Sequence, residues 1–300
     1  MNAVALTDHG RAGGLLKFKK ACETSGIKPI YGFEAYVAPE SHLTKEKIES
    51  HRKTSYHLTL LAKNTQGLEN IFQLTSIGWR QGFYYKPRIS FDLLKKHQEG
   101  LIILSGCGSG RLSQYIMDAK PELAIAHIKE MKDVWGDDFY IEVQNHGLDW
   151  QQPLRKRLFE LSEITTVPPV ATQDSHYPTR GDAKLHEAIC RLAAGDLTFD
   201  SDESYFKSHA QMCESFDPEE HHAITRTQEV ADKCNCNWSY GKTIWPVFEL
   251  SPGVTPEAEL RTKATEGFKR LFGDGDTEYR ERLEEELSVI QTMGLLPISW

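Results

Sequence analysis

Short apolar runs alternate with stretches of helical spacing along the first two-thirds of the chain. The apolar runs predict strands at Val4–Thr7, Ile27–Val37, Tyr56–Ala62, Leu101–Leu104, Phe139–Val143 and Pro168–Thr172. Apolar residues at helical spacing predict helices between them at Leu15–Cys22, Leu68–Ile77, Leu123–Val134 and Pro153–Ile164. Apolar runs separated by helices are typical of parallel strands that are buried on both faces. The pattern therefore predicts an α/β fold, either an open doubly wound sheet or a closed barrel.

The pattern changes after about residue 195, where the sequence becomes acidic and polar and predicts no further strand. Two helices are predicted close to the end of the chain, at Glu257–Phe272 and Glu278–Met293. We therefore predict two domains, one over residues 1–240 and one over residues 241–300.

Composition limits the class of protein. Hydrophobic residues make up 39% of the chain and charged residues 26%, which is enough apolar material for a core. The longest apolar runs are too short to cross a bilayer, so we expect no integral membrane protein and no membrane partner. No secretory signal is recognisable at the start of the chain. Six cysteines without a CxxC pair predict a reducing, cytoplasmic location.

The net charge of −8 is unevenly distributed. Residues 1–112 carry 16 Lys and Arg against 9 Asp and Glu, whereas the remaining residues are strongly acidic. Ordinary solvated faces explain such an imbalance, and this is the simpler interpretation. The alternative is a basic flank beside a site for an anionic substrate, because the local field matters more than the total charge.

Residue types that bind metals recur at the ends of the predicted strands. In a barrel, residues just past the strand ends meet at one mouth, where the fold places its chemistry. Imidazole, carboxylate and thiolate ligands together favour zinc, whereas manganese or iron prefers more nitrogen and oxygen ligands. Taken singly, each of these residues is more readily explained as a core or surface residue. Taken together, they predict a metal site formed by six side chains: His9, Glu34, His57, Cys107, Asp174 and His176.

Several ordered motifs carry a resemblance to a known family. They are Ala5-Leu6-Thr7-Asp8-His9-Gly10, Gly32-x-Glu34-Ala35-Tyr36-Val37, His57-Leu58, Lys86-Pro87-Arg88-Ile89, Leu104-Ser105-Gly106-Cys107 and Asp174-x-His176-Tyr177. In these segments the chain resembles the polymerase-and-histidinol-phosphatase (PHP) domain that begins the alpha subunits of bacterial DNA polymerase III, the replicative C-family polymerases. Arg282-Leu283 and Met293-Gly294, with residues between them, resemble the run into the polymerase palm, so the resemblance covers about residues 1–294.

The resemblance implies a fold and assigns roles to residues. The fold would be a PHP-type distorted (β/α)7 barrel followed by a mostly helical segment leading into the palm. The family's metal-binding positions fall on the six residues picked from the strand ends, with one or two ions of Zn²⁺ or Mn²⁺ expected. Asp8 would orient the site from behind the ligands, and Lys86 and Arg88 would contact phosphate or DNA.

The resemblance also implies that the chain lacks parts of the family's full length. Met1 stands just before the Thr7-Asp8-His9 motif, so the family's first strand and its ligands would be missing. The palm aspartates that hold Mg²⁺ for polymerisation would lie beyond Trp300, and this chain would not polymerise DNA. The full-length protein would bind template-primer DNA, the sliding clamp, the proofreading exonuclease subunit and the clamp loader.

Three functions follow from these observations. The first is a metal-dependent phosphoesterase with 3′–5′ exonuclease-like activity inside a replicative polymerase. The second is a non-catalytic PHP domain that supports the polymerase structurally. The third is a stand-alone PHP phosphatase, which the palm-like residues 245–294 argue against.

Overall fold

The structure is a computed structural model that describes residues 1–46, 53–194, 201–241, 249–273 and 277–295. It divides into two compact units, Met1–Trp238 and Ser239–Trp300.

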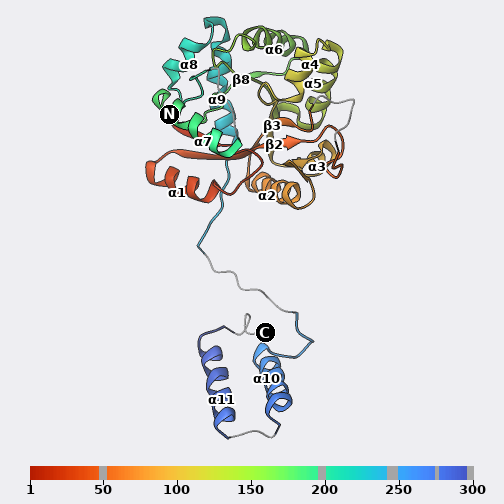
Figure 1. Ribbon diagram of the computed structural model, residues 1–300, viewed down its shortest axis with the longest axis vertical. Helices are drawn as coiled ribbons and strands as arrows, with labels where there is room; N and C mark the ends of the chain where they lie inside the picture. The colour runs from red at the N-terminus through yellow and green to blue at the C-terminus, as the bar shows by residue number, and fades with distance from the viewer. Residues whose placement is uncertain (47–52, 195–200, 242–248, 274–276, 296–300) are drawn as a thin grey trace. The chain divides into compact units, whose positions relative to one another are not determined.

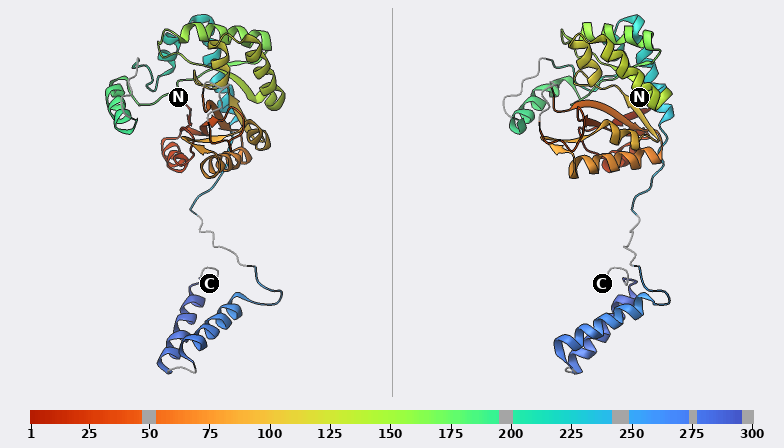
Figure 2. Two further views of the ribbon diagram at one scale, coloured as in Figure 1. Left: turned by 45° about the vertical axis from the view of Figure 1, so that its right-hand side comes forward. Right: turned by 90° about the vertical axis from the view of Figure 1, so that its right-hand side faces the viewer.

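The first unit is built on one curled sheet surrounded by helices (Figures 1 and 2). Its strands are β1 (Ala3–Leu6), β2 (Lys28–Val37), β3 (Tyr56–Ala62), β4 (Phe83–Tyr84), β5 (Lys86–Ile89), β6 (Leu101–Leu104), β7 (Phe139–Val143) and β8 (Pro169–Ala171). The strand order is β4-β5-β2-β3-β6-β7-β8, and β1 pairs with the first half of β2.

Four strand pairs are parallel, as the sequence predicts, whereas the β4–β5 hairpin and both pairs that involve β3 are antiparallel. Strand β3 runs antiparallel to both of its neighbours, β2 and β6, so the expectation of parallel strands is wrong at this position. A parallel partner needs a crossover connection, usually a helix, and the described residues between β2 and β3 form no helix. The reversal has a consequence for the site, because it brings the first residues of β3 to the edge where the parallel strands end.

The α-helices of the first unit fill the connections and continue the chain after β8. They are α1 (Leu15–Ser25), α2 (Thr65–Arg80), α3 (Phe91–Lys96), α4 (Arg111–Met117), α5 (Pro121–Trp135), α6 (Gln151–Thr165), α7 (Ala183–Ala194), α8 (His209–Ser215) and α9 (His221–Lys233). Short 3₁₀ turns occupy Gly136–Asp138, Arg180–Asp182 and Pro218–Glu220. The sequence analysis predicted no helices where α7, α8 and α9 lie.

The two faces of the sheet build two separate apolar clusters. Side chains alternate between the faces along each strand. Leu60 and Ile103 therefore join the outer cluster, whereas Leu61 and Ile102 join the inner one. The outer cluster packs against the apolar sides of α1 to α6, and Met212 of α8 with Ala223 and Ile224 of α9 extends it. The inner cluster is covered by α9 through Val230 and Ala231. One face of the curled sheet is therefore closed by a ring of helices and the other by a single helix.

The second unit is a pair of helices, α10 (Pro256–Phe272) and α11 (Thr277–Thr292). An ion pair between Arg261 and Glu284, 2.7 Å long, joins the two helices, and the rings of Phe272 and Tyr279 stack. Among the described residues, no helix has the length and apolar character that crossing a bilayer requires. The predicted fold class, a distorted barrel of the α/β type with a helical segment after it, is confirmed.

Close packing between α2 and the start of β6 depends on Gly67. The helix begins where the Asn64 side chain accepts a hydrogen bond from the Gly67 backbone N–H, 2.9 Å long. A Cβ on Gly67 would lie 1.7 Å from the carbonyl oxygen of Gly100. We expect Gly67→Ala to lower the free energy of unfolding by about 1–3 kcal/mol or more, because the backbone has to move apart. Urea unfolding followed by circular dichroism measures this change.

Gly13→Ala is the matched control for this substitution. A Cβ on Gly13 meets no atom within 4 Å, so the same added methyl group costs little there. Equal stability of the two variants would show that the contact between Gly67 and Gly100 does not limit the packing of α2.

Candidate metal centre

Three side chains from β2, β3 and the loop after β1 form the centre of the site. His9 pairs with Glu34 as a parallel bridge beyond the end of β1, and His57 lies opposite Tyr36 at the start of β3. His9 Nε2 lies 3.1 Å from one carboxylate oxygen of Glu34, and His57 Nδ1 donates to the other. One potential ligand atom from each residue lies within 4.8 Å of the others. Glu34 thus holds two imidazoles from different strands around one point.

Cys107 joins these three residues from the loop after β6. Its sulfur lies 3.4 Å from His57 Nδ1 and 3.6 Å from a Glu34 oxygen, and it accepts a hydrogen bond from the Ser109 backbone N–H. The loop can approach β3 this closely because residue 106 is glycine with φ of +85°, where a Cβ would lie 2.4 Å from the His57 carbonyl oxygen. The short sequence Gly106-Cys107 is thus what brings the thiol to the centre.

Asp174 and His176 approach from the segment after β8. The ring of His176 lies 6.0 Å from that of His9, and its Nδ1 is 2.8 Å from the Asp174 carbonyl oxygen. Asp174 has φ of +46°, an uncommon conformation for a residue other than glycine and one that recurs at functional sites. All six residues predicted from the sequence therefore lie around the same region of the sheet edge.

The charge of the centre is set by burial and by close neighbours. Burial raises the pKa of the Glu34 carboxyl, but the hydrogen bond from His57 and the charges of His57 and His9 outweigh it, so this pKa lies below its ordinary value. Burial lowers the pKa of His9. Burial and the nearby carboxylates of Glu34 and Asp174 raise the pKa of the Cys107 thiol well above its usual range. These shifts favour an ionised Glu34 carboxylate, a neutral His9 ring and a protonated Cys107 thiol.

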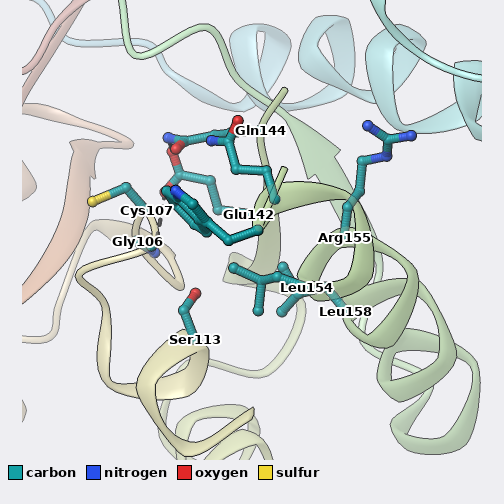
Figure 3. A pocket seen from close by; sticks show the side chains of 11 residues that line it. Gly106, Cys107, Ser113, Glu142, Gln144, Leu154, Arg155 and Leu158 are labelled. Carbon is teal, nitrogen blue, oxygen red and sulfur yellow. Dashed lines mark hydrogen bonds between the residues drawn. The ribbon is translucent and has the colours of Figure 1, made fainter. Parts of the chain in front are cut away.

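Glu142 lies behind Cys107 and is a residue that the sequence analysis missed. It is a fully buried carboxyl group in the middle of β7, and Figure 3 shows it beside Gly106 and Cys107. Its two oxygens accept hydrogen bonds from four donors, three on other segments and one just after β7: Thr59 Oγ1 (2.9 Å), the Gly106 N–H (3.1 Å), Thr172 Oγ1 (2.6 Å) and Gln144 Nε2 (3.1 Å).

These bonds tie the segments that carry the candidate ligands to one another. Thr59 is two residues from His57, Gly106 precedes Cys107, and Thr172 is two residues from Asp174. The sequence signal was present, since Glu142 is the one charged residue in the run Phe139–Val143. Burial, with the charges of Asp174 and Glu34, raises the pKa of Glu142 to about 7, and hydrogen bonds from Thr172 and Thr59 oppose this.

His186 on α7 is a second residue that the sequence analysis missed. Its ring lies 5.6 Å from that of His176, and its Nε2 is 3.5 Å from the Cys190 sulfur one turn along the helix. A hollow beside His176 is lined by both histidines together with Lys184 and Asp202. The row of imidazoles from His57 through His9 and His176 thus continues to the surface.

The remaining predicted residues differ in their placement. Asp8 is exposed, and its carbonyl oxygen accepts a hydrogen bond from the Glu34 N–H. Lys86 is exposed, and its Nζ lies 5.5 Å from the centre of the Tyr36 ring. Arg88 is 2% exposed and donates to the carbonyl oxygens of Gly82, Thr44 and Thr54. A phosphate cannot reach this guanidinium, so the predicted DNA contact of Arg88 is corrected to a structural role.

The donor set fits a divalent cation. Two imidazoles and a carboxylate lie around one point, close enough to share an ion after small side-chain adjustments, and the Cys107 thiol adjoins them 3.4 Å from His57 Nδ1. A buried carboxylate facing two histidines is a ligand arrangement that zinc and manganese both accept.

Comparison with known proteins identifies the class. Residues 1–146 match the model of the PHP domain family. The chain is 38% identical to DNA polymerase III subunit alpha of Borreliella burgdorferi over 98% of its own length and 26% of that protein. It is 35% identical to the same subunit of Thermus aquaticus, with 98% and 25% covered, and 34% identical to that of Aquifex aeolicus, with 97% and 27% covered.

The chain is therefore homologous to the PHP region of DNA polymerase III alpha subunits, and the resemblance drawn from the motifs is confirmed. It spans about a quarter of the length of the curated relatives it matches.

The raised pKa of Glu142 predicts a pH-dependent stability. Between its ordinary pKa of 4.5 and about 7, the folded state holds a proton on Glu142 that the unfolded state has lost. The free energy of unfolding of the wild type therefore falls as the pH rises through this range. The side chain in Glu142→Gln does not titrate. The variant's free energy of unfolding minus that of the wild type should therefore rise from pH 5 to pH 8, by at most about 3 kcal/mol. Urea unfolding at several pH values, with EDTA present, measures the difference.

The control is Glu122→Gln on α5, where the carboxyl group is exposed. Its stability relative to wild type should stay flat across the same pH range. A flat difference for Glu142→Gln as well would mean that the carboxyl of Glu142 is ionised throughout this range in the folded protein.

Proposed function

We propose that this chain carries the metal-dependent phosphoesterase site of a PHP domain, with 3′–5′ exonuclease-like activity on nucleic acid. The observation that carries the proposal is the meeting of His9, Glu34, His57 and Cys107 from four separate segments of the sheet edge. Asp174 and His176 complete the six proposed ligands, and one or two ions of Zn²⁺ or Mn²⁺ would be bound.

The chain's own residues prepare the centre for a cation. When bound, a divalent cation polarises a phosphoryl oxygen and supplies hydroxide at neutral pH. Glu34 orients both imidazoles, and the low pKa of His9 keeps its ring neutral, which is the form that donates a lone pair. The thiol of Cys107 has to lose its proton to bind a metal, so binding should release a proton and weaken as the pH falls.

Basic side chains near the centre support an anionic substrate. Lys86 lies over Tyr36, whose ring contacts the rings of His9 and His57. Lys53 donates to Ser109, two residues after Cys107. Some of the excess positive charge of residues 1–112 therefore lies beside the proposed metal site. This supports the interpretation of that charge as a basic flank for an anionic substrate.

We further propose a role in DNA replication in the cytoplasm, on the basis of the homology to DNA polymerase III alpha subunits. The whole protein would bind template-primer DNA, the sliding clamp, the proofreading exonuclease subunit and the clamp loader. Its polymerase aspartates, which would hold Mg²⁺, would lie outside these 300 residues. The residues 241–300 would then be a linker and the beginning of the palm region.

A structural role is the second candidate, and one feature favours it. The carboxylate of Glu34 already has both imidazoles as partners, and Glu142 has four donors, so the polar groups are satisfied by hydrogen bonds alone. A centre of this kind can hold the strand ends together without catalysis.

Metal content separates the two candidates. We expect the purified chain to contain stoichiometric zinc or manganese by plasma mass spectrometry. The double variant Cys107→Ala, Asp174→Ala should lose metal affinity by about tenfold or more, because two of six proposed ligands are removed. Cys213→Ala, Asp92→Ala is the control, since both residues lie away from the centre.

A folded wild-type chain without metal, even after incubation with Zn²⁺ or Mn²⁺, would contradict the enzymatic proposal and leave the structural one. If the double variant and its control kept the same metal content, the ions would be bound elsewhere.

A further inference from the structure

A cluster of exposed aromatic side chains lies at the end of α2 and on the β4–β5 hairpin. Trp79, Phe83 and Tyr85 are 45%, 46% and 77% exposed, and Tyr84 is half-buried beside them. The rings of Trp79 and Phe83 stack 5.5 Å apart, and those of Tyr84 and Tyr85 meet edge to face at 4.6 Å. We call these four residues the aromatic platform. Large exposed aromatic groups in such density mark interaction sites on soluble proteins.

The platform is held rigidly by the protein beneath it. The buried guanidinium of Arg88 donates to the Gly82 carbonyl oxygen at the base of the hairpin and lies 4.9 Å from the centre of the Tyr84 ring. A Cβ on Gly82 would lie 1.8 Å from the Arg88 carbonyl oxygen, so glycine is required where the hairpin leaves α2. The rings are thus presented on a fixed support.

Tyr85 combines an exposed ring with a strained backbone. It sits at the turn between β4 and β5 with φ of +58°, a conformation that glycine adopts without cost and a bulky residue does not. Its side chain is mostly in solvent, so it does not fill the core. Backbone strain is tolerated at functional sites, so the strain at Tyr85 supports a function for its exposed ring.

The charge around the platform is positive. Arg11, Arg80 and Lys86 are exposed there, and Arg11 lies 5.9 Å from the centre of the Trp79 ring. No Asp or Glu occurs between residues 70 and 91 or between residues 9 and 22. Aromatic rings interleaved with cations are the combination that binds single-stranded nucleic acid, because bases stack on rings and phosphates pair with cations.

The platform is joined directly to the candidate metal centre. Trp79 Nε1 donates to the Gly10 carbonyl oxygen, 2.9 Å away, and Gly10 follows His9. Lys86 lies over the Tyr36 ring, which is 5.8 Å from the His9 ring and 5.1 Å from the His57 ring. A strand whose bases stacked on Trp79 and Phe83 would bring its backbone past Lys86 toward these histidines.

We infer that the aromatic platform binds a single-stranded polynucleotide by base stacking, with Lys86 and Arg11 on its phosphates, and leads one end of the strand to the metal centre. The inference rests on the proposed function for the hydrolytic step and names its substrate class. Binding itself needs no metal, so the two can be tested apart.

The binding test uses fluorescence anisotropy of a fluorescein-labelled 20-mer of thymidine with the full chain, in EDTA and low salt. Trp79→Ala should weaken binding roughly tenfold, as the loss of one stacking ring does elsewhere. Lys86→Gln should weaken it and lower the slope of log affinity against log salt by about one. Tyr279→Ala, an exposed aromatic on α11, is the control and should bind like wild type.

Tyr85→Gly keeps the test independent of folding defects. Glycine relieves the positive φ, so the thermal midpoint should not fall, whereas binding should weaken roughly fivefold. If Tyr85 served stability alone, Tyr85→Gly would lower the thermal midpoint and leave binding unchanged.

A folded wild-type chain that does not bind the oligonucleotide at low salt would overturn the inference, and the platform would then be a surface for a protein partner. Equal binding by wild type, Trp79→Ala and Tyr85→Gly would overturn it too. Hydrolysis of bis(p-nitrophenyl) phosphate by the Mn²⁺-loaded wild type tests the metal centre separately, because this ester is too small to span the platform. Binding that depends on Trp79, without such hydrolysis, would uphold the platform and contradict the phosphoesterase proposal.

Discussion

The alternation of side chains along the strands governs the inner face of the curled sheet, and the candidate site depends on it. On β2, β3 and β7 the same alternate positions carry Ile30 and Glu34, His57 and Leu61, and Tyr140 and Glu142. One end of the inner face is apolar and packs on α9, while the other end carries polar side chains that need partners. A shift of one residue in any of these strands would exchange the two faces and destroy the core and the site together.

Burial makes the polar end of this face costly unless each group is paired. Glu34 and Glu142 are both buried carboxyl groups, and each is surrounded by donors from other strands. The two arrangements differ in consequence. Glu34 faces two imidazoles that can turn to a cation, whereas Glu142 faces hydroxyl and amide groups and can only fix the segments that carry Thr59, Gly106 and Thr172. Glu142 thus supports the segments that surround Glu34.

The surface beside the metal centre depends on the buried side chain of Arg88. Arg88 was expected at a phosphate, but its donors satisfy carbonyl oxygens under the β4–β5 hairpin. This buried cation anchors the hairpin, and the hairpin in turn exposes Tyr85 and places Lys86 over the Tyr36 ring. The motif predicts two basic contacts with phosphate or DNA, at Lys86 and Arg88. In the structure Arg88 is buried and holds the hairpin, and Lys86 is exposed.

The sequence by itself determined the class of fold, the six ligand candidates and the family, because apolar periodicity and short ordered motifs are local properties. It placed Glu257–Phe272 within one residue of α10 for the same reason. It missed α9, whose few apolar residues become core only in the folded protein: Ala223 and Ile224 join the outer cluster, and Val230 and Ala231 join the inner one. Only the tertiary structure decided the antiparallel direction of β3, the four donors to Glu142 and the burial of Arg88. The direction of β3 depends on strand pairing, and most partners of Glu142 and Arg88 are 30 or more residues away along the chain. Periodicity along the chain does not report which distant groups meet.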